Sequence, residues 1–223
     1  MTRILTIFIG PPGSGKGTLS QMMVRKLGWK QVSTGNLCRK NIQEGTNIGK
    51  EIDFAIKSGK LVPDELITKM VYNWFAQNQT CEQSIILDGY PRTLQQARDF
   101  DHFMKTLPFD IQVIHFILDD ETIINRLKSR YICENKECQA AYAVFPGSPH
   151  APTQAGICDE CSGRLQRRKD DTETAIKERL KVYHQHAKPL LHFFMEEHYP
   201  VHDLKANKSA ENLFLELRKM IGV

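Results

Sequence analysis

The sequence predicts a three-layer α/β fold in which helices cover both faces of a five-stranded parallel sheet. Two observations carry this prediction. Short apolar runs that are typical of strands alternate along the chain with helix-compatible stretches, which is the pattern of a parallel sheet built from βαβ units. In addition, the first apolar run, 4–9, leads directly into a glycine-rich turn and then into a helix-compatible stretch.

The expected elements follow one another in a regular order. Residues 4–9 are apolar and β-branched, which is typical of a buried strand, and 84–88 is a second such run that ends in a carboxylate. The expected strands are 3–9, 29–32, 84–88, 111–118 and 200–204. The expected helices lie near 16–27, 35–44, 48–58, 64–77, 93–105, 120–130, 172–198 and 208–220. Ligands of such sheets bind beyond the carboxyl ends of the strands. We therefore expect Ser33-Thr34, Asp88-Gly89 and Asp119 to meet at one edge.

Composition limits the classes of function that need to be considered. At 223 residues the chain is long enough for one large domain, with or without small insertions. A net charge of +4, spread along the chain, suits an anionic ligand but does not favour a nucleic-acid binder. No apolar stretch approaches membrane-spanning length, and the apolar run at the N-terminus is too short for a signal peptide. We expect a cytoplasmic protein.

Residues 10–18 read Gly-Pro-Pro-Gly-Ser-Gly-Lys-Gly-Thr and predict a phosphate-binding loop. Free backbone N–H groups at the start of the following helix point at phosphate oxygens, and the helix dipole favours negative charge there. Lys16 can reach the β- and γ-phosphates, and the Thr18 hydroxyl would lie near Mg²⁺. Gly17 departs from the general motif, in which Ser or Thr follows the lysine directly. The alternative is a glycine-rich turn with a surface lysine.

Four of the six cysteines gather in the segment 131–167, which is rich in polar residues, Gly and Pro. Cys133 and Cys138 form Cys-x4-Cys, and Cys158 and Cys161 form Cys-x2-Cys. Four thiolates at such spacing suit tetrahedral Zn²⁺, with reduced or disulfide-bonded cysteines as the alternative. Of the remaining candidates, Cys38 and Cys81 are expected to be buried or inert thiols, His150 an exposed loop residue, and His184 and His186 surface or packing residues of a long helix.

The loop 10–18 and the motif Asp88-Gly89-Tyr90-Pro91-Arg92 together resemble the nucleoside monophosphate kinases, and the adenylate kinase family most closely. Further motifs of that family occur in the same order along nearly the whole chain. They are Ser33-Thr34-Gly35, Gly59-Lys60-Leu61-Val62-Pro63, Thr93 with Gln96, and Arg168-Lys169-Asp170-Asp171 with Arg179. The resemblance implies a P-loop fold and the reversible, Mg²⁺-dependent transfer of a phosphoryl group from ATP to AMP, which gives two ADP.

The resemblance implies an AMP site assembled from short segments. Its expected residues are Thr34, Gly35, Arg39, Lys60, Leu61, Val62, Gly89, Tyr90, Pro91, Arg92, Gln96, Arg168 and Arg179. Arg39 and Arg92 would hold the AMP phosphate, because a planar guanidinium matches phosphate oxygens. The amide of Gln96 both donates and accepts hydrogen bonds, so it would read the adenine edge.

The resemblance also implies an ATP site and a transfer path lined by arginines. The expected ATP-binding residues are Gly13, Ser14, Gly15, Lys16, Gly17, Thr18, Arg126, Arg130, Ala141, Tyr142 and Lys208. The expected catalytic residues are Lys16, Asp88, Arg92, Arg126, Arg130, Arg168 and Arg179. Arg126 and Arg130 are expected on one face of a helix, four residues apart. Catalysis would consist of positioning and positive charge, with Asp88 organising water on Mg²⁺ and no general base.

Three parts of the chain follow from the resemblance. The core would comprise 1–32, 63–128 and 172–223, the AMP-binding flap 33–62, and the lid 129–171. Such a lid excludes water from the reacting phosphates, and a structural Zn²⁺ would stabilise a segment too small for a core of its own. Two residues depart from the family pattern. Cys133 is displaced by two positions, and Asn36 stands where many members carry an acid.

Other functions stay open at this point. A UMP/CMP kinase or a kinase that uses GTP is the nearest alternative, although the long lid and Gln96 favour adenylate. A nucleotide-dependent zinc-ribbon protein that binds nucleic acid is permitted by the cysteines, but the lid has few of the aromatic and basic residues such a protein needs. We expect a monomer whose partners are ATP, AMP and ADP, with neither nucleic acid nor membrane.

Overall fold

The structure is a computed structural model of the whole chain, and it describes residues 3–57, 62–78, 82–135, 138, 140–145, 148, 150–168 and 171–223. Lys60, Leu61 and Cys81 lie outside these ranges. The chain forms two compact units. The first comprises Met1–Ile9, Met23–Ile114 and His186–Val201. The second comprises Gly10–Met22, His115–Gln185 and His202–Val223.

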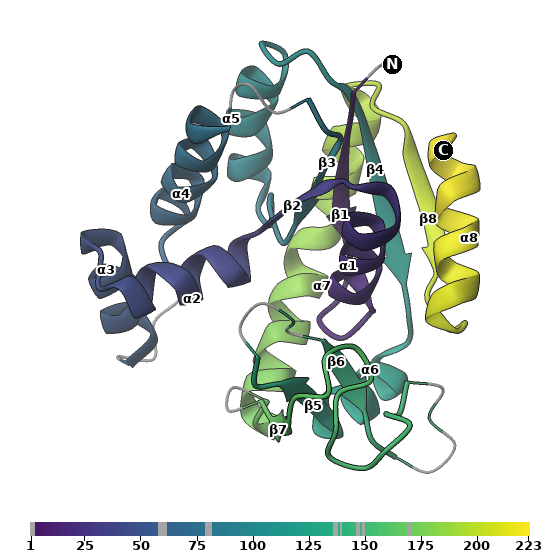
Figure 1. Cartoon of the computed structure of the whole chain (residues 1–223). Coiled ribbons are helices and arrows are strands. Elements are labelled where there is room, and N and C mark those ends of the chain that lie inside the picture. Colours follow the sequence, from purple (N-terminus) through teal and green to yellow (C-terminus); the bar gives the residue numbers. More distant parts are fainter. Residues whose placement is uncertain are drawn as a thin grey trace. The chain divides into compact units, whose positions relative to one another are not determined.

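Strands and helices alternate in the predicted order (Figure 1). The five-stranded parallel sheet has the order β2-β3-β1-β4-β8. Its strands are β1 (Ile4–Ile9), β2 (Lys30–Ser33), β3 (Ile85–Asp88), β4 (Asp110–Ile117) and β8 (Val201–Lys205). The helices are α1 (Lys16–Leu27), α2 (Thr34–Glu44), α3 (Asn47–Lys57), α4 (Asp64–Gln77), α5 (Leu94–Met104), α6 (Asp120–Lys128), α7 (Glu173–Glu196) and α8 (Ala210–Ile221). Each predicted strand and helix is confirmed, with ends that differ by at most two residues.

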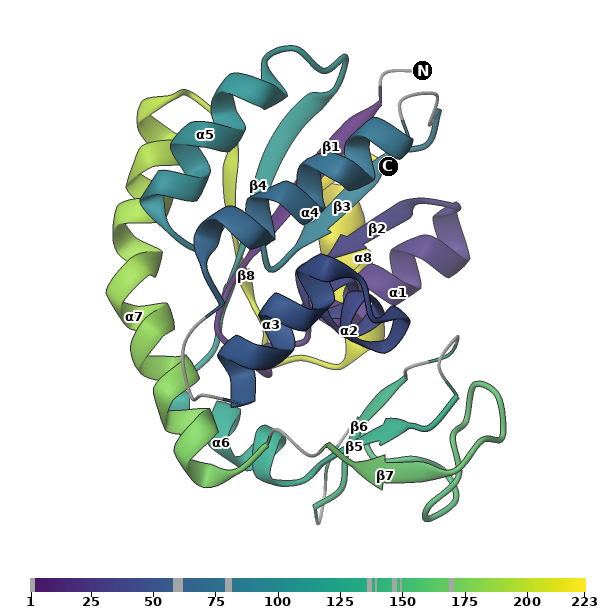
Figure 2. The same ribbon diagram turned by 90° about the vertical axis from the view of Figure 1, so that its left-hand side faces the viewer.

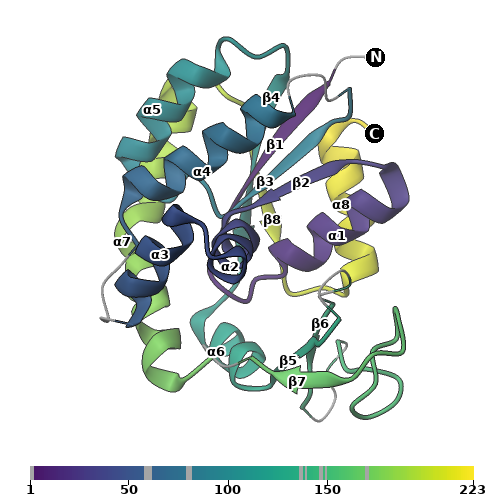
Figure 3. The ribbon, with the colours of Figure 1, turned by 60° about the vertical axis from the view of Figure 1, so that its left-hand side comes forward.

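Three strand ends meet in the first unit, where β2, β3 and β1 lie side by side (Figure 3). Phe8 of β1 and Ser33 of β2 both pair with Asp88 of β3. The apolar residues of these strands are buried against α4, α5 and the C-terminal half of α7, which together make a core of aliphatic and aromatic side chains. This core holds the carboxyl ends of the strands at one edge, as the alternating sequence predicts.

The helices α2 and α3 pack against each other in the first unit, within the predicted flap (Figure 1). A Cβ atom on Gly49 would lie 2.0 Å from the carbonyl oxygen of Asn41, so the two backbones approach very closely. The turn between the helices is held by Thr46, whose hydroxyl accepts from the Gly49 amide at 3.0 Å. The close approach of α2 and α3 therefore requires a small residue at position 49.

The cysteine-rich segment of the second unit contains a small antiparallel sheet that the sequence did not reveal (Figure 2). Its order is β6-β5-β7, with β5 at Arg130–Cys133, β6 at Ala141–Ala143 and β7 at Leu165–Arg167. The expectation that Arg126 and Arg130 share a helix face is wrong. Helix α6 ends at Lys128, and the Arg130 backbone pairs with Ala143 of β6. Strand pairing has taken the backbone groups that another helical turn would have used.

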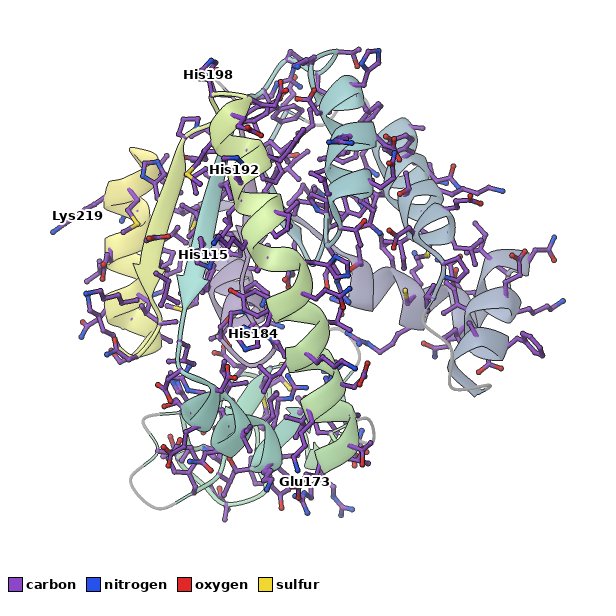
Figure 4. The ribbon with its side chains drawn as sticks, turned by 180° about the vertical axis from the view of Figure 1, so that it is seen from behind. His115, Glu173, His184, His192, His198 and Lys219 are labelled. Carbon is purple, nitrogen blue, oxygen red and sulfur yellow. The ribbon has the colours of Figure 1, made fainter. Side chains whose placement is uncertain are left out.

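Helix α7 is the longest helix of the described chain, with 24 residues. Glu173 lies at its start, and His184 and His192 lie along it (Figure 4). His184 is exposed and bonds to Asp120 at 2.9 Å, which agrees with the prediction of a surface residue. Over the ranges that the structure describes, no helix is both long and apolar enough to cross a membrane.

Candidate functional site

The predicted phosphate-binding loop lies between β1 and α1. The Lys16 ammonium is directed back along this loop and donates to the carbonyl oxygens of Gly10 and Pro11, both at 2.7 Å, and to the Ser14 hydroxyl at 3.3 Å. Gly13 has a φ of 79°, and a Cβ atom there would lie 2.9 Å from Leu127 Cγ, so only glycine fits. Because α1 begins at Lys16, the positive end of the helix dipole lies at the end of this loop. The loop thus presents a cation and a helix N-terminus together, which is suited to a phosphate.

A second cluster surrounds Gly89 in the first unit. The carbonyl oxygen of Gly89 accepts hydrogen bonds from the Thr34 hydroxyl at 2.9 Å and from Arg92 Nε at 2.8 Å. Arg92 Nη2 also lies 3.5 Å from Thr34 Oγ1. Gly89 has a φ of 82°, and a Cβ atom on it would lie 2.7 Å from the Thr34 hydroxyl. Residues predicted from two separate motifs are therefore joined, with the Arg92 side chain held at the exposed surface.

Arg39 reaches the same neighbourhood from α2. Its guanidinium makes a short hydrogen bond to the side-chain oxygen of Asn36, so the residue that departs from the family pattern orients this arginine. Burial raises the pKa of the Cys38 thiol, and the charges of Arg92 and then Arg39 oppose the rise. The two arginines predicted to hold one phosphate thus act on the same thiol. Cys38 is half-buried and remains protonated, as expected for an inert cysteine.

Gln96 is buried at the start of α5, with 2 % of its surface exposed. Its side-chain oxygen accepts a hydrogen bond from the backbone N–H of Arg92 at 2.7 Å. Its backbone N–H donates to the Thr93 hydroxyl at 3.2 Å. The side chain is therefore oriented by the backbone of the motif that precedes it. Asp88 is the first residue of this motif, at the end of β3 and opposite Phe8 and Ser33 in the sheet register.

The second unit contains the remaining predicted arginines, and an aspartate joins two of them. Asp171 accepts from Arg130 Nε at 2.6 Å and from Arg130 Nη2 at 2.7 Å, and it also accepts from Arg179 Nη2 at 2.7 Å. Its side chain is only 5 % exposed. Burial lowers the pKa of Arg130, the carboxylate of Asp171 opposes this, and the charges of Arg168 and Arg179 lower it further. Three predicted arginines therefore share one electrostatic environment.

Asp171 was missed as a site residue, although it ends the motif Arg168-Lys169-Asp170-Asp171. The sequence feature that could have revealed it is its position three residues after Arg168. A carboxylate is the natural partner that keeps neighbouring guanidinium groups charged and oriented. Arg126 is held differently, through a bond from Nη2 to the carbonyl oxygen of Ala206 at 3.1 Å. Lys208, predicted near the ATP adenine, is exposed and paired with Glu216 of α8.

The four cysteines of the cysteine-rich segment, of which Cys133 ends β5, bring their sulfur atoms together, all within 4.8 Å of one another. Cys133 Sγ lies 3.4 Å from Cys161 Sγ, and Cys138 Sγ lies 3.6 Å from Cys158 Sγ. A tetrahedral Zn²⁺ with bonds of about 2.3 Å holds its sulfurs about 3.8 Å apart, whereas a disulfide requires about 2 Å. The four thiols are free, so the arrangement fits a metal and not the disulfide alternative.

The thiols differ in their surroundings. Burial raises the pKa of Cys133 to about 12 and also raises the pKa of Cys138, whereas Cys158 is the thiol whose surroundings favour the thiolate. Burial raises the pKa of Cys158, but hydrogen bonds from the Tyr142 hydroxyl, the amides of Glu160 and Cys161, and Cys138 outweigh it and lower the pKa to about 7. Such donors favour the thiolate, which is the form that binds metals. A Cβ atom on Gly163 would lie 3.0 Å from Cys133 Sγ and 3.3 Å from Cys161 Sγ, so glycine leaves the sulfurs their room.

Tyr142 and His150 also lie in the cysteine-rich segment. The Tyr142 hydroxyl lies 3.4 Å from Cys158 Sγ and accepts from the Asp159 amide at 2.8 Å, which links the predicted adenine-flanking pair Ala141-Tyr142 to the cysteine cluster. His150 is partly buried, so the expectation of an exposed loop residue is wrong. Its carbonyl oxygen accepts from the Ala143 amide at 3.0 Å, which holds it against β6. Burial and then the charge of Arg126 lower its pKa.

Comparisons with known proteins agree with these clusters. A family model described as adenylate kinase matches residues 8–199. The adenylate kinase of Borrelia turicatae is 38 % identical over 97 % of this chain and 98 % of its own length. Those of Fervidobacterium nodosum and Clostridioides difficile are 35 % and 34 % identical, each over 97 % of this chain and over 96 % and 97 % of their own lengths. The match covers the phosphate-binding loop, the Gly89 cluster and the cysteine-rich segment alike.

Proposed function

Because the chain belongs to the adenylate kinase family, we propose that it transfers a phosphoryl group reversibly from ATP to AMP and forms two ADP. The observation that supports this most is the Gly89 cluster, in which Thr34 and Arg92 converge on one carbonyl oxygen beside Arg39. Two guanidinium groups at the surface of one cluster suit a nucleoside monophosphate, whose phosphate carries two negative charges.

The acceptor AMP is proposed to contact several short segments of the chain. Arg39 and Arg92 hold its phosphate, and Gln96 reads the adenine edge from a position set by its bond to the Arg92 amide. Thr34, Gly35, Lys60 to Val62 and Gly89 to Pro91 complete the surface. Arg168 and Arg179 contact the phosphate being transferred.

The donor ATP is proposed to contact residues of the second unit. Residues 13–18 hold its phosphates through Lys16 and the amides of the α1 N-terminus. Arg126 and Arg130 contact the same phosphates, and Ala141, Tyr142 and Lys208 lie beside the adenine. The transition state of phosphoryl transfer spreads negative charge over the equatorial oxygens, so fixed positive groups supply the catalysis. The Asp171 carboxylate keeps Arg130 and Arg179 charged and oriented.

Two metal ions are part of the proposal. Mg²⁺ bound with ATP neutralises phosphate charge, and Asp88 and Thr18 are the residues that would hold its water molecules. Cys133, Cys138, Cys158 and Cys161 would hold a structural Zn²⁺, because their four sulfurs fit a tetrahedron and fill every ligand position. We further propose that the segment 129–171 acts as the lid and 33–62 as the AMP-binding flap. The core would comprise 1–32, 63–128 and 172–223.

The protein is proposed to act as a monomer in the cytoplasm. Free thiols at metal-binding distances suit a reducing compartment, and ATP, AMP and ADP are its proposed partners. Size-exclusion chromatography with light scattering would test the monomer: a mass near 25.6 kDa supports it, and twice that mass contradicts it.

The test of the proposed function is ADP formation from Mg-ATP with AMP, CMP, UMP or GMP as acceptor. We expect rapid turnover with AMP alone, and slower turnover when GTP replaces ATP. A clear preference for CMP or UMP would identify a pyrimidine nucleotide kinase instead. No transfer to any acceptor would contradict the proposed function.

A further inference from the structure

Helix α4 carries a row of polar side chains along one face. Asp64, Thr68 and Tyr72 are spaced four residues apart, so they lie one above the other on the helix surface. Each makes a hydrogen bond to the segment 90–99, which comprises the end of the Gly89 motif and the start of α5. Thr93 donates to Asp64 Oδ2 at 2.6 Å, Thr68 and Tyr90 share a bond of 3.1 Å between hydroxyls, and Tyr72 donates to the Asp99 carbonyl oxygen at 2.9 Å.

The middle bond is the one that reaches the Gly89 cluster. The Tyr90 side chain is completely buried, and its ring packs edge-on against Phe100 at 5.1 Å between ring centroids. A buried hydroxyl requires a partner, and the Thr68 hydroxyl supplies it. Burial raises the pKa of Tyr90, so the phenol stays neutral. The ring is thus fixed by α5 on its edge and by α4 at its hydroxyl.

Tyr90 lies between Gly89 and Arg92, two residues of the Gly89 cluster. Gly89 on one side offers the carbonyl oxygen that accepts from Thr34 and Arg92, and Pro91 and Arg92 follow on the other side. A shift of the Tyr90 ring moves this carbonyl oxygen, and the Arg92 guanidinium that it orients moves with it. The bond between Asp64 and Thr93 acts on the same motif. The Thr93 hydroxyl also accepts a hydrogen bond from the backbone N–H of Gln96, and the Gln96 side-chain oxygen accepts one from the backbone N–H of Arg92.

We propose that Thr68, acting through the Tyr90 hydroxyl, is a positioning residue for the phosphate-binding Arg92 of the acceptor site, a role that rests on the proposed function. Nothing in the motif that ends at Arg92 reveals this partner, because Thr68 lies on a different helix. The proposal assigns different roles to Thr68 and Tyr72. Both bond to the same neighbouring segment, but only Thr68 connects to the cluster, whereas Tyr72 contacts the α5 backbone.

The experiment measures the Kd for AMP by calorimetry without ATP, and kcat and KM for both nucleotides. Thr68→Val removes the hydroxyl while preserving shape, and should raise Kd and KM for AMP about fivefold, the effect of one lost hydrogen bond. The KM for ATP should change less than about twofold. Thr68→Ser keeps the hydroxyl and should restore wild-type values. Tyr90→Phe should match Thr68→Val, and the double variant should be no worse than either single one.

Tyr72→Phe is the matched control, because it removes a hydroxyl from the next turn of the same face. It should lower the melting temperature without raising the KM for AMP. Equal effects of Thr68→Val and Tyr72→Phe, or equal changes in KM for ATP and AMP, would overturn the proposal. Wild-type protein that forms no ADP would overturn the proposed function and this role with it. If the wild-type protein forms ADP but Thr68→Val leaves the affinity for AMP unchanged, the role of Thr68 alone is overturned.

Discussion

The Gly89 cluster and the cysteine cluster are stabilised in opposite ways. Thr34, Gly89 and Arg92 lie on strand ends and helix starts that pack into the large apolar core of the first unit. Among the residues that the structure describes, the core of the cysteine cluster consists of three buried residues, Cys133, Ala140 and Cys158, with a few partly buried neighbours. The comparison shows that one chain can hold one cluster in place with buried hydrocarbon and another with four thiols that could bind a metal ion. Substitutions should therefore affect chemistry in the first region and stability in the second.

The largest effect is expected from Arg92→Ala. Loss of the guanidinium proposed to hold the acceptor phosphate should lower kcat/KM for AMP by about 10² to 10³, as for other donors to charged oxygens in active sites. The melting temperature should stay within about 2 °C because the side chain is exposed. Steady-state kinetics and calorimetry check this. Arg98→Ala, which changes an exposed arginine on the following helix α5, is the control, and an equal loss in both variants would refute the assignment.

The second largest effect is expected from Asp171→Asn, which should lower both stability and turnover. It removes the charge that neutralises Arg130 and Arg179 at a side chain that is only 5 % exposed. The free energy of unfolding should fall by about 3 kcal/mol, the usual result of breaking a buried ion pair on one side. Turnover should fall about tenfold to a hundredfold as the guanidinium groups lose orientation. Denaturant unfolding and kcat measure the two effects. An unchanged kcat in a destabilised variant would mean that Asp171 contributes to stability and not to catalysis.

Loss of the metal should act on stability alone. Cys158→Ser with Cys161→Ser should abolish binding of zinc and lower the melting temperature by roughly 5–10 °C, because the small sheet has little core. Turnover at low temperature should change less than about twofold. Zinc content by mass spectrometry, calorimetry and kcat are the measurements, with Cys38→Ser as the variant that keeps its zinc. A large loss of turnover in a still-folded variant would show that the metal also tunes catalysis.

The smallest effect is expected from Asn36→Asp. The substituted side chain keeps the oxygen that accepts from Arg39 and adds a charge next to a group proposed to bind phosphate. The KM for AMP should rise about twofold, since an exposed charge pair is worth little. Asn36→Ala removes the acceptor and should raise KM more than Asn36→Asp does. The reverse order would mean that Asn36 does not orient Arg39.

Much of this molecule was predictable because its signals are local. The strand at 4–9 and the loop at 10–18 are contiguous, so apolar pattern and glycine spacing sufficed to find them. The turn between Arg126 and Arg130 was not predictable in this way. Its helix ends at Lys128 because Arg130 pairs with Ala143, and a partner thirteen residues along the chain leaves no mark on the local pattern. The partial burial of His150 has the same origin, since its carbonyl oxygen is bound by β6.

The sequence by itself determined the fold class, the order of the elements, the four cysteines of the candidate metal site and the predicted phosphate-binding loop, because each rests on periodicity or on spacing within one segment. Only the tertiary structure decided which residues meet across segments. It joined Thr34 to Gly89, placed Asp171 between Arg130 and Arg179, and gave Tyr90 its hydroxyl partner in Thr68. The physical reason is that hydrogen bonds between side chains form at distances near 3 Å, which chain folding sets and residue order does not.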